Sequence, residues 1–249
     1  MKLLKIKMSL PAVCAVLLTA VASFSNAAGP GVSTGHDRLK PVSTGATSTH
    51  NRFTPKLVIE HGCQPFAAVD DSGNYNAGLN NSGAHNGGCS SSPSGQAYAR
   101  SACVGEYCGH MFVYYMPKDN GVPFAFFGHR HDFEEIVVWT RNNDIIGAAY
   151  SAHGDYYYDE NPYLSNGRVN ASYGIDAFTH SMGAVARRDR GDGTVWPAAS
   201  WELLTPRAKQ ALNDPSNWSA GNFAARDDNF KDKLNEARTR TVVNAGIRF

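Results

Sequence analysis

A short run of this chain gathers many side chains that can bind cations or exchange protons. Residues 128–135 read GHRHDFEE and supply two histidines, one arginine and three carboxylates. The next four residues, IVVW at 136–139, are typical of a buried strand. Because charge on this scale normally belongs to a solvated loop, its position at the edge of the core indicates a functional site.

The alternation of a strand sorts these side chains. If the strand begins near Asp132, Asp132 and Glu134 lie on one face and Phe133 on the other. We expect His129 and His131 to precede the strand in a loop.

A further carboxylate comes from upstream. Asp119 ends the strand-like stretch HMFVYYMPKD at 110–119 and can return to the same rim. Carboxylate oxygens with an imidazole beside them suit a hard divalent ion such as Mg²⁺, Ca²⁺ or Mn²⁺, and suit zinc less well. The residues alone leave other interpretations open: Arg130 could simply pair with a carboxylate, and the cluster could be a surface hydrogen-bond network.

Two zinc-hydrolase motifs are missing. The pattern H-x-H-x-D-H is not met, because Asp132 directly follows His131 and no histidine comes next. The sequence also contains no H-E-x-x-H. A metal-dependent hydrolase of glycans or phosphoesters is therefore a minor alternative.

The rest of the chain favours short strands and turns. Its 249 residues include 24 glycines, and the 18% share of charged residues is low for a globular protein. Runs rich in β-branched and aromatic residues occur at 95–102, 110–117, 134–140 and 144–154. Near the C-terminus, Thr205 can cap a helix that begins at Pro206, and residues 227–237 have apolar positions at helical spacing.

The N-terminus predicts export. Residues 1–27 combine a lysine-rich start, an apolar core and small residues before a cleavage point after Ala27, as in a secretory signal peptide. Residues 28–55 are rich in Gly, Ser, Thr and Pro and are expected to form a loose arm, and residues 56–249 a single domain. A membrane anchor is the weaker alternative, because the apolar stretch is short for a bilayer.

Charge and cysteines agree with a secreted protein. Cleavage would remove three lysines and no acids, which changes the net charge from +1 to −2. Such a chain lacks the excess of lysine and arginine with which proteins bind nucleic acid or anionic lipid electrostatically. Four cysteines would remain, and we favour the disulfides Cys63–Cys89 and Cys103–Cys108 over zinc binding, because the spacing lacks a C-x₂-C pair.

The charged heptad has a counterpart in a known family. GHRHDFE at 128–134 closely resembles the GHRHDWE signature of the necrosis-inducing proteins, the secreted NLP cytolysins of plant-associated microbes. Further blocks are similar in the same order, among them GQAYARS, MFVYYMPKD, SAHG, THS, WELLTPRAKQALND and NFAARDDNFKDKLNEA. The resemblance covers roughly residues 57–237.

This resemblance implies a fold and a mechanism. The family fold is a mainly β structure, a β-sandwich with flanking helices similar to actinoporins and fungal lectins. The resemblance assigns a divalent-metal site to Asp119, His129, Asp132 and Glu134. The ion and its acidic cavity would bind the sugar headgroup of plant sphingolipids, glycosyl inositol phosphorylceramides. The candidates for further headgroup contacts are His131, His153 and His180.

The implied protein is a secreted toxin, monomeric and without covalent catalysis, that damages the plasma membrane. A lectin-like protein that binds glycan without lysis is the main alternative.

Two departures from the family pattern stand out. Phe133 occupies the position where the family usually has Trp, and we expect aromatic packing to survive. The loop NGVPFAFF at 120–127 is longer and more apolar than usual, which could displace Asp119. We hypothesise that Phe124, Phe126 and Phe127 form an apolar finger that contacts the membrane; the alternative is that they pack inward as a core strand.

Overall fold

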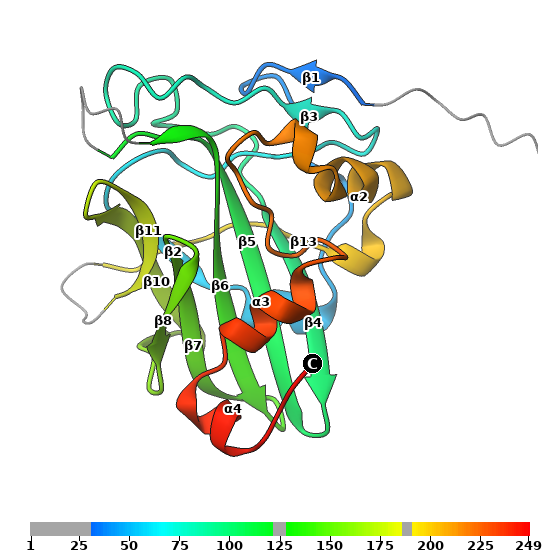
Figure 1. The fold of residues 1–249 in the computed structure, drawn as a ribbon, viewed down its shortest axis with the longest axis vertical. Coiled ribbons are helices and arrows are strands. Elements are labelled where there is room, and N and C mark those ends of the chain that lie inside the picture. Colours follow the sequence, from blue (N-terminus) through cyan, green and yellow to red (C-terminus); the bar gives the residue numbers. More distant parts are fainter. Residues whose placement is uncertain (1–30, 122–127, 186–190) are drawn as a thin grey trace, which may run out of the picture.

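Two β-sheets pack face to face in the computed structural model, which describes residues 31–121, 128–185 and 191–249 (Figure 1). The larger sheet has the strand order β13-β4-β5-β6-β7-β8. Its strands are β13 (Ala198–Ser200), β4 (Ala97–Val104), β5 (Tyr107–Asp119), β6 (His129–Arg141), β7 (Asp144–Ala152) and β8 (Asp155–Asp159). The predicted mainly β sandwich is confirmed.

The smaller sheet covers one face of the larger one and has the order β11-β10-β2-β12, with β9 paired to β10. Its strands are β2 (Lys56–Ile59), β9 (Leu164–Ser165), β10 (Arg168–Asp176), β11 (Thr179–Ala184) and β12 (Thr194–Val195). A separate pair is formed by β1 (Ser33–Thr34) and β3 (Tyr75–Asn76).

The long strands β5 and β6 form the centre of the larger sheet. They pair antiparallel from Tyr107 opposite Arg141 to Asp119 opposite His129. Most of their side chains are buried on both faces, which explains the near-continuous apolar runs in the sequence. By alternation, Asp132, Glu134 and Ile136 of β6 face the smaller sheet, and the residues between them face the helices.

Helices and single 3-10 turns cover the other face of the larger sheet; in Figure 1, α3 crosses in front of β5 and β6. The helical elements on this face are η2 (Trp201–Leu203), α2 (Pro206–Asn213), η3 (Pro215–Asn217), α3 (Phe230–Glu236) and α4 (Arg240–Asn244). A further helix, α1 (Ser48–Phe53), lies on the side of the smaller sheet. The predicted cap of α2 is confirmed, because the Thr205 hydroxyl accepts from the Ala208 amide at 3.1 Å. The indole of Trp139 on β6 donates to the Ala237 carbonyl at the end of α3, at 2.8 Å.

The expectation of a loose arm at 28–55 is wrong for the described residues from 31 onward. Leu39, Val42 and Phe53 insert into the core. His50 of α1 is buried as well and contacts the hydroxyls of Ser200 and Ser101 at 2.6 and 2.7 Å. A few anchoring side chains order this segment, and they are too sparse to produce a periodic pattern. The predicted signal peptide, 1–27, lies outside the described residues.

Both predicted disulfides are present, Cys63–Cys89 and Cys103–Cys108. Among the described residues, no helix combines the length and the apolar character needed to cross a bilayer.

Candidate metal centre

The ends of β5 and β6 bring the first two candidate ligands together. Asp119 is the last residue of β5 and pairs with His129, the first residue of β6. Gly128 precedes His129 with φ +97°, and a Cβ there would lie 2.4 Å from the Asp119 carbonyl oxygen. The first glycine of the heptad is therefore required by a close backbone approach. β6 begins three residues earlier than the expected start at Asp132, so both His129 and His131 belong to the strand and not to a preceding loop.

A pocket of about 260 Å³ opens beside this strand pair. One wall comes from β5 and β6, a second from the β7–β8 turn and β11, and a third from residues 220–222. Gly221 lets this third segment approach, since a Cβ there would lie 2.5 Å from the His131 carbonyl oxygen. The lining residues are Asp119, His129, Asp132, Phe133, Glu134, His153, Gly154, Thr179, His180, Ala220, Gly221 and Asn222.

Three side chains converge inside the pocket. Asp119, His129 and Asp132 each offer a ligand atom, and these atoms lie within 4.8 Å of one another. Both carboxylates are buried, and the imidazole Nδ1 of His129 is a buried nitrogen without a hydrogen-bond partner in the described part of the chain. The His129 nitrogen nearest to Asp119 is the other one, Nε2, which lies 4.0 Å from Asp119 Oδ2. Two carboxylates and one imidazole thus fit a hard divalent cation.

The electrostatics of the pocket also favour a cation. Burial and the neighbouring Asp119 carboxylate raise the pKa of Asp132 to about 7, although the Tyr173 hydroxyl donates to Asp132 Oδ2 at 2.7 Å and opposes the shift. Burial and the nearby Asp132 raise the pKa of Glu134 well above its usual range. No lysine or arginine is among the described residues that line the pocket. Asp132 and Glu134 therefore retain part of their protons near neutral pH, and a bound cation would displace those protons.

Glu134, the fourth expected ligand, lines the same pocket but lies outside the group of three. Its Oε2 accepts a hydrogen bond from the Ser151 hydroxyl of β7. The structure thus brings three of the four expected ligands together and places the fourth beside them.

His180 lies behind Asp119 as a supporting residue. Its Nδ1 lies 2.6 Å from Asp119 Oδ1, and its ring stacks on Tyr173 with centroids 4.8 Å apart. Its Nε2 lies 2.9 Å from Nδ1 of His61, which continues the contact toward the surface. His180 lines the pocket, but buried contacts occupy both of its ring nitrogens.

The two other candidate histidines have different positions. His153 lies at the rim, half-exposed, with Nε2 3.4 Å from Asp176 Oδ2 and Nδ1 3.0 Å from the Thr179 hydroxyl. His131 does not reach the pocket. Its Nδ1 lies 2.8 Å from the Tyr115 hydroxyl, and its ring packs edge-on against Trp218.

The backbone explains why His129 and His131 separate. Regular alternation would place both on the same face as Phe133. His131 adopts φ +62°, a left-handed conformation that interrupts the alternation. His129 therefore joins Asp132 in the pocket, while His131 stays in the aromatic layer with Phe133 and is not a candidate headgroup contact.

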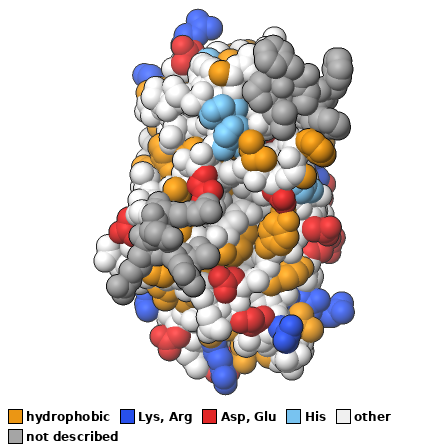
Figure 2. Space-filling model, turned by 90° about the vertical axis from the view of Figure 1, so that its left-hand side faces the viewer, with side chains coloured by type: hydrophobic (Ala, Val, Ile, Leu, Met, Phe, Trp, Pro, Cys, Tyr) orange, Lys and Arg blue, Asp and Glu red, His pale blue; other side chains and the backbone are white. Residues whose placement is uncertain are grey.

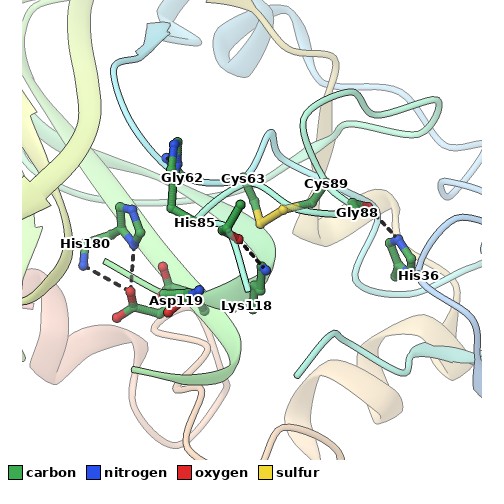
Figure 3. Close-up of a disulfide and its surroundings, with 12 residues drawn as sticks. His36, Gly62, Cys63, His85, Gly88, Cys89, Lys118, Asp119 and His180 are labelled. Carbon is green, nitrogen blue, oxygen red and sulfur yellow. Dashed lines mark hydrogen bonds and ion pairs between the residues drawn. A yellow bond between two sulfur atoms is a disulfide. The ribbon is translucent and has the colours of Figure 1, made fainter. Parts of the chain in front are cut away.

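The polar loop at 74–95 supports the end of β5. Figure 3 shows the Cys63–Cys89 disulfide next to His85 and Lys118, with Asp119 and His180 beyond them. The buried Lys118 ammonium donates to the carbonyls of Ser82 and Ala84 at 3.1 and 2.9 Å. The amide of Asn120 donates to the Gly83 carbonyl at 3.0 Å. The two neighbours of Asp119 in the chain, Lys118 and Asn120, therefore both bond to a loop that the disulfide holds in place. The proposed finger residues, Phe124, Phe126 and Phe127, lie outside the described residues.

Sequence reasoning missed several residues that shape the site. Tyr173 and His61 carried no signal, because they come from segments whose proximity only the fold reveals. Ser151 begins the family-like block SAHG, but the block itself did not show that its hydroxyl bonds to Glu134. The segment 220–222 lies at the start of a family-like block, but nothing in the sequence pointed it toward the heptad.

Fold and pocket together define a class: a β-sandwich with an acidic, cation-compatible cavity at the end of its two longest strands. The chain belongs to the necrosis-inducing protein family, because the family described as necrosis inducing protein (NPP1) matches residues 47–237. It is 35% identical to NLP effector protein 10 of Phytophthora capsici over 218 residues, which cover 82% of this chain and 90% of that protein.

Solved structures support the same assignment. Necrosis and ethylene inducing protein 2 from the causal agent of cocoa's witches' broom disease is similar with a TM-score of 0.78 and 29% identity, over 84% of this chain and 99% of that one. NLPPya in complex with mannosamine is similar with a TM-score of 0.75 and 30% identity, over 84% of this chain and all of the other (100%).

Proposed function

We propose that this protein is a secreted cytolysin that binds a divalent cation at Asp119, His129 and Asp132, with Glu134 as a fourth ligand. The loaded pocket would bind the glycan headgroup of plant glycosyl inositol phosphorylceramides, and the bound protein would damage the plasma membrane and cause necrosis. The observation that carries the proposal is the convergence of three donor side chains in an acidic pocket that no described lysine or arginine lines.

The donor set favours Mg²⁺ or Ca²⁺, with Mn²⁺ as a further candidate. Such an ion takes more ligands than these four protein side chains supply, so water or sugar hydroxyls would complete its shell. The ion would supply positive charge to a pocket of carboxylates and direct coordination to a polyol. Asp119 and Asp132 would hold the ion, and the Tyr173 hydroxyl would keep Asp132 in place.

A sugar headgroup suits the remaining walls. His153, Thr179 and Asn222 offer polar groups around the rim of the pocket. The mannosamine complex of NLPPya supports a sugar ligand for this chain. A lectin-like protein that binds glycan without lysis is the second candidate, and the same comparison favours it.

Apolar side chains beside the pocket would contact the membrane. Ile175 and Phe178, at the β10–β11 turn next to Thr179, are 45% and 56% exposed. Exposed apolar side chains gather on the side of the molecule that carries β8, β10 and β11 (Figure 2). Exposed apolar groups next to a headgroup pocket suit shallow insertion into the bilayer interface.

The finger hypothesis adds Phe124, Phe126 and Phe127 to this membrane contact. Replacement of all three by Ser tests it. Retained folding with lost vesicle binding supports the finger, whereas an unfolded product supports inward packing as a core strand.

Dye leakage from vesicles tests the central proposal. We expect leakage only from vesicles that carry the plant glycolipid, and only without EDTA. Asp132→Ala should abolish leakage while circular dichroism remains native. Asp144→Ala is the matched control, because Asp144 is exposed at the start of β7. Undiminished leakage from Asp132→Ala contradicts the mechanism, and vesicle binding by the wild type without leakage selects the lectin-like function.

A metal-dependent hydrolase is the least supported alternative. Residues 31–35 read GVSTG, which satisfies the letters of the nucleophile-elbow motif G-x-S-x-G. Ser33, however, lies in β1 opposite Tyr75 and not at a turn from a strand into a helix. We therefore propose an action without covalent catalysis; product release from candidate glycans that a chelator stops would contradict it.

Export and a monomeric state complete the proposal. N-terminal sequencing of the protein from culture medium should find a chain that starts after Ala27. Light scattering of that material should give the mass of a single chain.

A further inference from the structure

β6 and β7 separate at the edge of the main pocket. Their backbone pairing extends to Ile136 opposite Tyr150. One residue further, Glu135 is no longer paired with a residue of β7, and its amide donates to the Ser151 hydroxyl at 2.8 Å. The same hydroxyl donates to Glu134. A side chain therefore takes the place of a ladder bond, and the two strands splay apart.

A second cavity of about 90 Å³ lies where the strands separate. It adjoins the main pocket, since Phe133, Glu134, Gly154 and Asn222 line both. The residues that line the second cavity alone are Glu135, Ser151, Asp155 and Lys233.

An acid with one unused oxygen lies in this cavity. Glu135 is only 6% exposed, and its Oε1 accepts from the Tyr156 hydroxyl at 2.5 Å. The other carboxylate oxygen has no hydrogen bond to any described residue and is accessible from the cavity. It can therefore accept a hydrogen bond from a ligand.

A lysine side chain lines the same cavity. Lys233 comes from α3, and its side chain is 17% exposed. Its ammonium donates to the Gly154 carbonyl at 3.3 Å and to Glu236 Oε2 at 2.5 Å. The cavity therefore presents a hydrogen-bond acceptor from β6 and a donor from the helical layer.

We propose that this side cavity is a specificity subsite that binds hydroxyl groups of the sugar seated in the main pocket, with Glu135 as acceptor and Lys233 as donor. The inference rests on the proposed function. A hydroxyl both donates and accepts, so it can satisfy a carboxylate and an ammonium together. The volume suits a hydroxyl or hydroxymethyl group and is too small for a second sugar ring. In the described part of the chain, only Asp119, His129 and Asp132 converge as metal ligands, so a second ion is not the expected occupant.

Sugar affinity measured against metal affinity tests the subsite. The probe is D-mannosamine with Ca²⁺, and the variants are Glu135→Gln, which keeps an acceptor for Tyr156, and Lys233→Met. Each should weaken mannosamine binding about tenfold and leave the Ca²⁺ affinity unchanged. Lys231→Met is the control, because Lys231 is exposed on the same helix. Unchanged mannosamine affinity in both Glu135→Gln and Lys233→Met overturns the subsite.

Deoxygenated sugars locate the contact. Wild type should discriminate by about tenfold between D-mannosamine and one of its monodeoxy analogues, and Glu135→Gln should lose that discrimination. Equal discrimination in both proteins overturns the role of Glu135. A wild type that binds no sugar in the presence of Ca²⁺ overturns the proposed function itself and removes the subsite with it. Lys233→Met remains informative should Glu135→Gln fail to fold.

Discussion

His180 holds Asp119 through one carboxylate oxygen and leaves the other oxygen to the pocket. The ring Nδ1 and the backbone amide of His180 lie 2.6 and 3.2 Å from Asp119 Oδ1. Asp119 Oδ2 faces His129, with the His129 Nε2 at 4.0 Å. The carboxylate is therefore oriented before any cation arrives, and this arrangement makes His180 a residue that positions a metal ligand.

Removing that support should weaken metal binding. His180→Phe preserves an aromatic ring against Tyr173 but loses the hydrogen bond to Asp119. We expect a 10- to 100-fold, order-of-magnitude loss of Ca²⁺ affinity by calorimetry. His180→Asn retains a donor and should lose less. Equal affinity in wild type and a folded His180→Phe contradicts the positioning role.

Ionisation of Asp132 should make the metal-free protein less stable as pH rises. The pKa of Asp132 is about 7 in the folded protein, above its ordinary value of 3.8. The unfolded chain therefore binds fewer protons than the folded one between about pH 4 and pH 7, and stability present below pH 4 is lost across this window. The loss from Asp132 is at most about 4 kcal/mol. Urea denaturation in EDTA across this range measures it.

Two comparisons sharpen that measurement. Added Ca²⁺ should restore stability at pH 7 more than at pH 5, because the ion needs ionised ligands. The lowered pKa of His61, His110 and His131, about 4 in each case, makes stability rise over the same range. The Asp132 contribution is therefore the difference in stability between wild type and Asp132→Asn. That difference should fall between pH 4 and pH 7, and a difference that does not change with pH contradicts the assignment.

The two disulfides should differ in their effect on the site. Cys63–Cys89 spans 26 positions and ties down the loop behind Asp119, whereas Cys103–Cys108 spans 5 in the turn between β4 and β5. Loop entropy predicts that replacement of each pair by Ser costs about 3.5 and about 2 kcal/mol of unfolding free energy. Only the first replacement should also weaken Ca²⁺ binding. Equal Ca²⁺ affinity in both folded variants shows that the loop does not support Asp119.

Phe133 should contribute to stability through packing on the helical side. Its ring lies 5.0 Å from Tyr115, 5.1 Å from Trp218 and 5.4 Å from Phe223, centroid to centroid. Phe133→Ala should therefore lower the free energy of unfolding by about 3–5 kcal/mol. Phe133→Trp, which restores the residue usual in the family, should keep the aromatic contacts and cost less. Chemical denaturation measures both, and a cost below about 1 kcal/mol for Phe133→Ala contradicts the packing role.

Local patterns predicted much of the fold. The four strand-like runs correspond to β4, β5, β6 and β7 within a few residues, except that β6 starts five residues before its run, because β-branched and aromatic runs between turns need little tertiary context. Thr205 and Pro206 fixed the start of α2, since capping depends on adjacent residues. The N-terminal segment escaped prediction, because three separated apolar residues order it through contacts with distant strands.

The sequence by itself determined the ligand types and placed three of them in one heptad. Strand alternation then assigned Asp132 and Glu134 to a common face. Only the tertiary structure decided which side chains share the pocket. The left-handed φ at His131 interrupts the alternation of β6 and so places His129 on the pocket side. The pairing of Asp119 with His129 sets the register between β5 and β6. The distant Ser151, Tyr173 and His180 bond to the pocket acids. These features depend on contacts between residues far apart in the chain, and periodicity within a segment carries no information about such contacts.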